Sequence, residues 1–365
     1  MKKFIFILSV ATLIFVGYVF VFGGKGEPAI RPHEGEVTDP ILLPVIEKFA
    51  DAVDANPSAP KPRMELGMTY EGATLNKLAE QTYNQYTKQF PERVIGWYRL
   101  AIVQQRMGEL EKAIHSLSNG AKVAPPKMAA PHWQLGLWLI DTGKIEEAKK
   151  SIAVADSIQP NTMQVLIAKG RIALAESNPE RAIEILNNNR LISKVPDGYV
   201  YQLLGRAYRA AGDEEKSRES WSRAGKSTPK WGDPWTATVV KHVTGLMALR
   251  QEIIQLVNSN NIVVAREKIN RYVSYEPNNR VVRRLDAMCD LKEGKPAKAI
   301  QKWAVLIQED PKDIASMLLL GKARMRIKQF QTEEEIAKTK SVFEEILKID
   351  PNNAQAKQLL EILPE

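Results

Sequence analysis

The sequence predicts an all-α protein, a solenoid of about eight stacked helix pairs that follows a single N-terminal transmembrane helix. The chain has 365 residues, of which 44% are hydrophobic and 26% charged, as in ordinary globular proteins. Two patterns then decide the class. One long uncharged apolar run lies at the start, and small residues and prolines recur along the rest at intervals of about 34 residues.

The apolar run predicts a membrane anchor. It spans Phe4 to Phe22 without a charge, and a helix needs about 20 apolar residues to cross a bilayer. The apolar core of a cleaved signal peptide is shorter, about 7–15 residues. Lys2 and Lys3 precede the run, whereas the basic residues after it stand among acidic ones. The positive-inside rule therefore predicts a single pass through the inner (cytoplasmic) membrane by residues 1–22, with the remainder periplasmic or otherwise extracytoplasmic. Cleavage near Gly24 would instead release a soluble secreted protein.

Two short segments connect this anchor to the repeats. Residues 23–39 are rich in glycine, proline and charge, which predicts a flexible tether. Residues 40–56 place apolar side chains on one helical face. Because a terminal repeat needs a cover for its apolar side, we expect this segment to be a capping helix.

The body of the chain repeats one pattern. Leu204-Gly205-x-x-Tyr208 is followed at fixed distances by Gly212, Ser217, Trp221, Ala224 and Pro229. The same spacing recurs from Leu66-Gly67-x-x-Tyr70, from Trp97 and from Leu135-Gly136, and the prolines that close these units are Pro91, Pro125 and Pro160. Such a unit predicts a helix, a turn at a glycine, a second helix and a proline that ends it.

This pattern resembles the tetratricopeptide repeat (TPR) family, whose unit is about 34 residues long. The resemblance implies a right-handed superhelix in which each pair buries its apolar face against the next. We expect about five repeats in residues 60–230, about three in 246–353, and a closing helix in 354–365. About six extra residues lie near 329–337, and residues 231–245, with Trp231 and Trp235, interrupt the spacing as a junction.

Catalytic and metal-binding patterns are missing from the sequence. It has no glycine-rich phosphate loop, no His-Glu-x-x-His and no Gly-x-Ser-x-Gly motif. The single cysteine, Cys289, excludes a multi-cysteine metal site and stands beside Met288, which indicates a buried apolar role. The four histidines are dispersed, and the acidic run 333–335 is typical of a helix start. We therefore predict no enzymatic activity, no metal and no cofactor.

A partner-binding groove follows from the resemblance, which implies that first helices line a concave peptide-binding face. By register, the groove residues would be Met64, Met68, Tyr98, Ile102, Trp133, Leu137 and Ile140, followed by Arg171, Arg206, Arg209, Arg250 and Arg284. Tryptophan, tyrosine and arginine often carry interface energy, although some of these side chains would instead pack against a neighbouring unit. The family's clamp for a C-terminal carboxylate is not carried over, because Met64, Met68 and Arg99 occupy its places.

The Trp231–Trp235 junction is a second candidate surface; alternatively, the two tryptophans fill the seam between the repeat blocks. For function, we expect a membrane-anchored scaffold or adaptor that mediates protein–protein interactions, in assembly or maturation of an envelope, respiratory or cytochrome complex. Its partners would be membrane or periplasmic proteins or peptide segments, and residues 4–22 would contact the bilayer. One alternative is a permanent structural subunit of a membrane complex. Another is a binder of an acidic polymer, which the net charge of +8 motivates, although interleaved acidic residues argue against nucleic acid.

Overall fold

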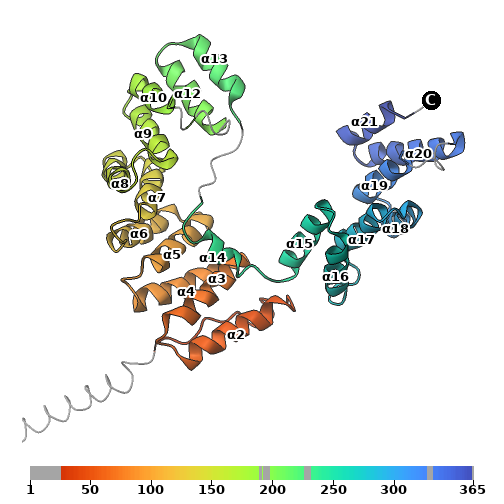
Figure 1. Cartoon of the computed structure of the whole chain (residues 1–365), viewed down its shortest axis with the longest axis horizontal. Coiled ribbons are helices and arrows are strands. Elements are labelled where there is room, and N and C mark those ends of the chain that lie inside the picture. The colour runs from red at the N-terminus through yellow and green to blue at the C-terminus, as the bar shows by residue number, and fades with distance from the viewer. Residues whose placement is uncertain (1–25, 189–190, 192–197, 226–231, 327–331, 364–365) are drawn as a thin grey trace, which may run out of the picture. The chain divides into compact units, whose positions relative to one another are not determined.

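A computed structural model describes residues 26–188, 191, 198–225, 232–326 and 332–363. This part of the chain contains nineteen helices and no strand, which confirms the predicted all-α class (Figure 1). Two compact units form: unit 1 comprises Met1–Thr38 and Leu43–Val243, and unit 2 comprises Asp39–Leu42 and Thr244–Glu365. The predicted transmembrane segment lies outside the described residues, and none of the described helices is long and apolar enough to cross a membrane.

Unit 1 consists of α2 (Leu42–Ala55), five antiparallel helix pairs and one short helix. The pairs are α3 (Pro60–Gly72) with α4 (Asn76–Gln89), α5 (Val94–Arg106) with α6 (Leu110–Lys122), α7 (Ala130–Asp141) with α8 (Ile145–Ile158), α9 (Met163–Ala175) with α10 (Pro179–Leu186), and α12 (Gly198–Ala210) with α13 (Glu214–Arg223). The short helix α14 (Thr236–Val240) packs against α3.

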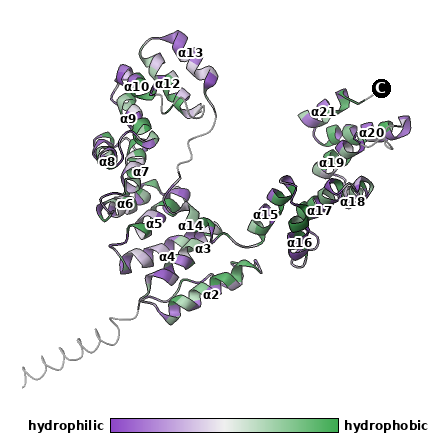
Figure 2. Cartoon of the chain, in the orientation of Figure 1, coloured by the Kyte–Doolittle hydropathy of each residue, from purple (hydrophilic) through white to green (hydrophobic). Residues whose placement is uncertain are grey.

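Unit 2 contains three further pairs and a closing helix. The pairs are α15 (Leu246–Asn258) with α16 (Ile262–Val273), α17 (Arg280–Lys292) with α18 (Pro296–Glu309), and α19 (Ile314–Arg324) with α20 (Glu333–Ile349). The last helix, α21 (Ala354–Glu361), packs on α20. Hydrophobic and hydrophilic residues alternate along the helices of both units, as expected where each helix buries only one face (Figure 2).

One small-to-large contact recurs in the helix pairs and sets their spacing. A glycine of the first helix meets a large side chain sixteen positions later in Gly67/Tyr83, Gly136/Ile152, Gly170/Leu186 and Gly205/Trp221. A Cβ atom on Gly67 would lie 2.4 Å from the Tyr83 ring, so the small residue is what allows the two helices to approach. In the last pair Gly321 meets Phe343, twenty-two positions later, which accounts for the predicted six-residue insertion.

The turn between the two helices of a pair requires a left-handed backbone residue. Glycine occupies this position in four pairs, for example Gly108 at φ 81° and Gly143 at φ 76°. Thr74, Ser177 and Asn260 occupy it elsewhere, at φ 60°, 58° and 61°. A side chain in this region crowds the backbone, most of all a β-branched one, so Thr74 stores strain that a glycine would not.

The predicted flexible tether differs from the structure. From residue 26 onward the segment is held on unit 1 by hydrogen bonds: the Tyr70 hydroxyl donates to the Ile30 carbonyl at 2.7 Å, and the Gln85 amide donates to the Pro28 carbonyl at 3.1 Å. Arg31 pairs with three carboxylates of α2, which are Glu47, Asp51 and Asp54. These acids stand three and four residues apart and so form one acidic row on the helix, which the composition of the segment alone did not reveal.

Candidate functional site

The structure buries most of the apolar groove that the sequence predicted to be open. Tyr98, Trp133 and Leu137 belong to one core cluster, and Ile102 and Ile140 pack against it. Met64 and Met68 are also buried. The repeat register thus correctly grouped side chains that lie together. These side chains pack against other parts of the chain instead of facing solvent.

The cover is a segment of the same chain. We call residues 232–243, which include α14, the inner segment. The Trp235 ring lies against the Tyr98 ring, with centroids 5.0 Å apart and planes tilted by 56°. At its far end, the His242 ring lies 5.7 Å from Phe49 of α2. Between them, α14 packs against α3. The inner segment thus crosses the face formed by α5 and α3 (Figure 1).

A buried ion cluster fixes one end of the inner segment. The Arg99 guanidinium donates from Nε to a Glu71 carboxylate oxygen at 2.9 Å, and from Nη1 to Asp233 at 3.0 Å. Tyr83 and Arg106 also contact Glu71, each at 3.0 Å. Arg99 and Glu71 are 1% and 0% exposed, so these contacts must offset a large desolvation cost. Burial lowers the pKa of Arg99, but the hydrogen bonds and charge of Glu71 and the charge of Asp233 hold it above its ordinary value.

Tyr98 has a polar atom that this arrangement does not satisfy. Its hydroxyl is buried and makes no hydrogen bond within the described part of the chain. Burial raises the pKa of the phenol, and the negative charge of Asp233 raises it further. The hydroxyl therefore stays protonated at neutral pH and remains available as a donor to an acceptor that enters this face.

The predicted basic part of the groove is divided. Arg171, Arg206 and Arg209 belong to unit 1, whereas Arg250 and Arg284 belong to unit 2. Arg171 pairs with Asp141, and Arg284 bonds Asp313 at 2.7 Å. The Arg209 guanidinium lies 5.9 Å from the Trp221 ring centroid, while Arg206 is exposed and Arg250 half-buried.

The Trp231–Trp235 junction, which is the second candidate surface, also differs from the prediction. Trp235 is partly buried on Tyr98, so it does not form an exposed aromatic loop. It packs against the core cluster that contains Tyr98 and Trp133 of unit 1. Trp231 lies outside the described residues.

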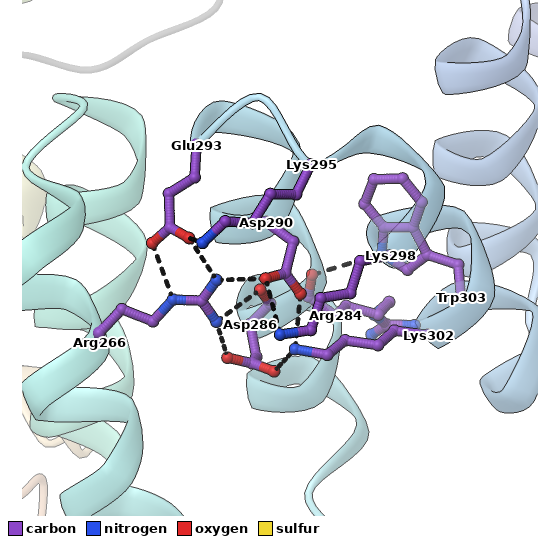
Figure 3. Close-up of polar contacts among 9 residues, drawn as sticks. All are labelled: Arg266, Arg284, Asp286, Asp290, Glu293, Lys295, Lys298, Lys302 and Trp303. Carbon is purple, nitrogen blue, oxygen red and sulfur yellow. Dashed lines mark hydrogen bonds and ion pairs between the residues drawn. The ribbon is translucent and has the colours of Figure 1, made fainter.

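Unit 2 contains a polar cluster that sequence reasoning missed (Figure 3). Arg266 of α16 donates to Asp286 and Asp290 of α17 and to Glu293, which follows that helix, at 2.6 Å for Asp290 and 3.1 Å for Glu293. Lys302 of α18 reaches the same Asp290 at 2.6 Å. Hydrogen bonds from Arg266 and Lys295 lower the pKa of Glu293 to about 2.

This cluster ties three helices together. A cavity of about 370 Å³ opens beside it, lined by Arg283, Asp286, Gln301, Lys302, Val305 and Leu306. The charged groups of the lining are already paired, since Arg283 bonds Glu309 and Lys302 bonds Asp286. We interpret the cluster as a structural fastening of α16, α17 and α18.

Cys289 is buried, as the sequence indicated, and its burial raises the pKa of the thiol. Within the described residues, no group of histidine, cysteine and acidic side chains is arranged to hold a metal ion.

No protein-family model matches the chain, and no curated protein matches it significantly. Solved structures resemble it at low identity. A crystal structure of MamA protein is 19% identical over 45% of this chain and 88% of that one, with a TM-score of 0.41. The TPR domain of P58(IPK) is 18% identical over 83% and 96%, with a TM-score of 0.27. Pseudomonas aeruginosa PilF is 15% identical over 67% and 99%, with a TM-score of 0.37.

These similarities concern the fold alone. The repeat class is established by the helix pairs themselves, with their period of about 34 residues and their recurring contact between a small residue and a large one sixteen positions later. The chain folds as repeating helix pairs of the tetratricopeptide kind, which agrees with the resemblance predicted from the sequence.

Proposed function

We propose that this protein is a non-enzymatic scaffold that binds segments of other proteins on the faces formed by its first helices. The observation that carries the proposal is the inner segment. Unit 1 holds this short piece of chain by an aromatic contact at Trp235 and an ion pair at Asp233, the two kinds of contact that dominate protein recognition.

We place the partner on the equivalent face of unit 2. Residues there that correspond in register to Tyr98 are Arg250, Arg284 and Leu318, and all three are partly exposed. Met247 on α15 is 55% exposed. This face combines arginine, methionine and leucine, which suits an apolar protein segment that also carries acidic groups.

We further propose that residues 4–22 anchor the scaffold in the cytoplasmic membrane with both units on the outer side. Its work would then be assembly or maturation of an envelope, respiratory or cytochrome complex. What supports this is the uncharged length of the run and the basic residues before it. A permanent subunit of a membrane complex would have the same anchor. It would differ from an assembly scaffold by binding its partner at a constant stoichiometry.

The scaffold proposal is tested by site-specific photo-crosslinking in the native cells. A crosslinking residue replaces Leu318 on the first-helix face of unit 2, and a matched control replaces Val263 on α16, which is 85% exposed. We expect Leu318 to give a discrete crosslinked protein and Val263 to give none. A constant stoichiometric product would indicate the permanent subunit. Equal labelling from both positions would overturn the proposed binding face.

The anchor is tested by fractionation of the full-length chain beside a variant without residues 4–22. We expect the full-length chain to stay in membranes after salt and alkaline washes, because an apolar helix of this length inserts stably. The shortened chain should appear in the soluble fraction. A shortened chain that remains in membranes, or a native chain trimmed near Gly24, would overturn the anchor.

A further inference from the structure

The inner segment has the features of a bound peptide rather than of a core element. The segment contacts the repeats through residues spaced along it, chiefly Asp233, Trp235 and His242. Of the side chains between them Val239 alone is buried, whereas its neighbours are exposed, and Val240 is 60% exposed. A helix of the repeat array instead buries a continuous stripe. The inner segment therefore rests on a surface that the helix pairs have already built.

The surface beneath the inner segment is complementary to an acidic residue. Arg99 and Arg106 both face Glu71, so without Asp233 the cluster holds two guanidinium groups and a single buried carboxylate. Arg99 forms a forked contact with Glu71 and directs its remaining Nη1 donor at the Asp233 carboxylate, 3.0 Å away. A second carboxylate at this place neutralises the cluster, and a buried arginine binds one strongly.

The same surface is complementary to an indole two residues further on. Tyr98 presents its ring to Trp235, and the apolar cluster around Trp133, Ile102 and Ile140 continues the site. The unsatisfied Tyr98 hydroxyl adds a hydrogen-bond donor for a peptide carbonyl of another chain. The site thus selects an acidic residue followed, two positions later, by tryptophan.

We propose that this face of unit 1 is a binding site for an external protein segment with that chemistry, and that the inner segment is its resident internal competitor. The inference rests on the proposed scaffold function and narrows it to a peptide class. Because the inner segment is covalently attached, it competes at an effective concentration of about 1 mM, typical of short connections. An external segment therefore binds only the molecules whose site is free, and its apparent affinity falls in proportion to that free fraction.

The test uses the full-length chain in mild detergent and a fluorescein-labelled synthetic peptide with the sequence of residues 232–243. It compares the wild type with Trp235→Ala, with Asp233→Asn and with the matched control Val240→Ala, which alters an exposed side chain of the same segment. We expect both site variants to bind the peptide at least about tenfold more tightly than wild type, because their internal competitor is weakened. Val240→Ala should bind like wild type. A peptide with Asn in place of Asp233 should bind about tenfold more weakly.

Thermal melts of each variant keep the outcomes separate. If Asp233→Asn and Trp235→Ala melt like wild type yet bind no peptide, the face is not a ligand site and the proposal is overturned. It is equally overturned if both variants lose cooperative unfolding, because the segment is then part of the core. Hydrogen exchange on the wild type adds a second readout: excess peptide should increase exchange of the inner segment's amides. None of these results requires the natural partner, so the crosslinking test of the scaffold can succeed or fail independently.

Discussion

The two units use the same helix pairs, but the first three pairs of unit 1 bury a face that the pairs of unit 2 leave partly exposed. In unit 1, Met64, Tyr98 and Trp133 hold equivalent positions and are all buried. In unit 2, the corresponding residues Arg250, Arg284 and Leu318 are all partly exposed. An aromatic and apolar face needs a cover to remove it from water, whereas a face with arginines can remain solvated. The repeat pattern therefore specifies the scaffold, and the residues on this face specify whether it is covered.

The charges differ in the same way. Unit 1 contains the fully buried Glu71–Arg99 pair, which Asp233 extends, beside exposed pairs elsewhere on its surface. Unit 2 spreads partly exposed pairs over α16, α17, α18 and α19, with Arg283–Glu309 as an example. Removing one member of a buried pair leaves a charge without compensation, whereas exposed pairs contribute little. The units should consequently respond very differently to the same kind of substitution.

The largest expected effect is the loss of Arg99. Arg99→Met leaves Glu71 and Asp233 without their cation and should destabilise the chain by about 3–5 kcal/mol. Arg283→Met in unit 2 should cost no more than about 1 kcal/mol, because its pair with Glu309 is partly exposed. Urea unfolding followed by circular dichroism measures both. Equal losses would show that the units do not differ in how they use charge.

Overpacking the shared small-to-large contact should affect both units alike. Gly67→Leu drives a side chain into the buried Tyr83, and Gly321→Leu does the same at Phe343. Each should lower stability by about 1–3 kcal/mol in thermal melts. Gly205→Leu should cost less, since its neighbour Trp221 is partly exposed and can move. An unchanged melting temperature for Gly67→Leu would show that this contact does not hold the pair together.

A glycine substitution in the turn of a helix pair should stabilise the two units by different amounts. Thr74→Gly relieves a β-branched side chain at φ 60°, and we expect a gain of about 1 kcal/mol. Asn260→Gly in unit 2 has nearly the same φ, but asparagine tolerates the left-handed region, so its gain should be only a few tenths of a kcal/mol. Matched melts of the two variants decide the point, and a larger gain at Asn260 would contradict the strain argument.

The smallest expected effect is a pH dependence from His242. Burial lowers its pKa from the ordinary 6.5, and the opposing charge of Glu65 does not cancel the shift. The unfolded chain then binds more protons, so stability is present above pH 6.5 and is lost as the pH falls toward and through the folded pKa. His242→Gln should reduce the stability difference between about pH 7.5 and about pH 5.5 by less than about 1 kcal/mol.

Burial also lowers the pKa of His132, which should therefore account for part of the remaining pH dependence of stability. Its matched variant, His132→Gln, gives the comparison. If His242→Gln leaves the pH dependence unchanged, the contact with Phe49 does not exclude water from the imidazole.

Local periodicity was enough to predict the helix pairs, because it is written within each unit of about 34 residues. Gly67 and Tyr83, or Gly136 and Ile152, stand at a constant distance in the chain, and this distance specifies both helices and the turn between them. The apolar face of the first helices was likewise visible in the register of Tyr98 and Trp133. What periodicity does not contain is information about which distant segment covers that face.

Only the tertiary structure decided the cover and the pinned N-terminal segment. Asp233 meets Arg99 across 134 positions, and Asp39 accepts a hydrogen bond from the Leu246 amide across 207. Such pairings obey no spacing rule, since closing a longer loop costs only slightly more entropy and many partners are therefore accessible. Which acid reaches the buried arginine depends on three-dimensional complementarity of shape and charge. The sequence by itself determined the repeat scaffold, and the folded chain determined that unit 1 binds a segment of itself.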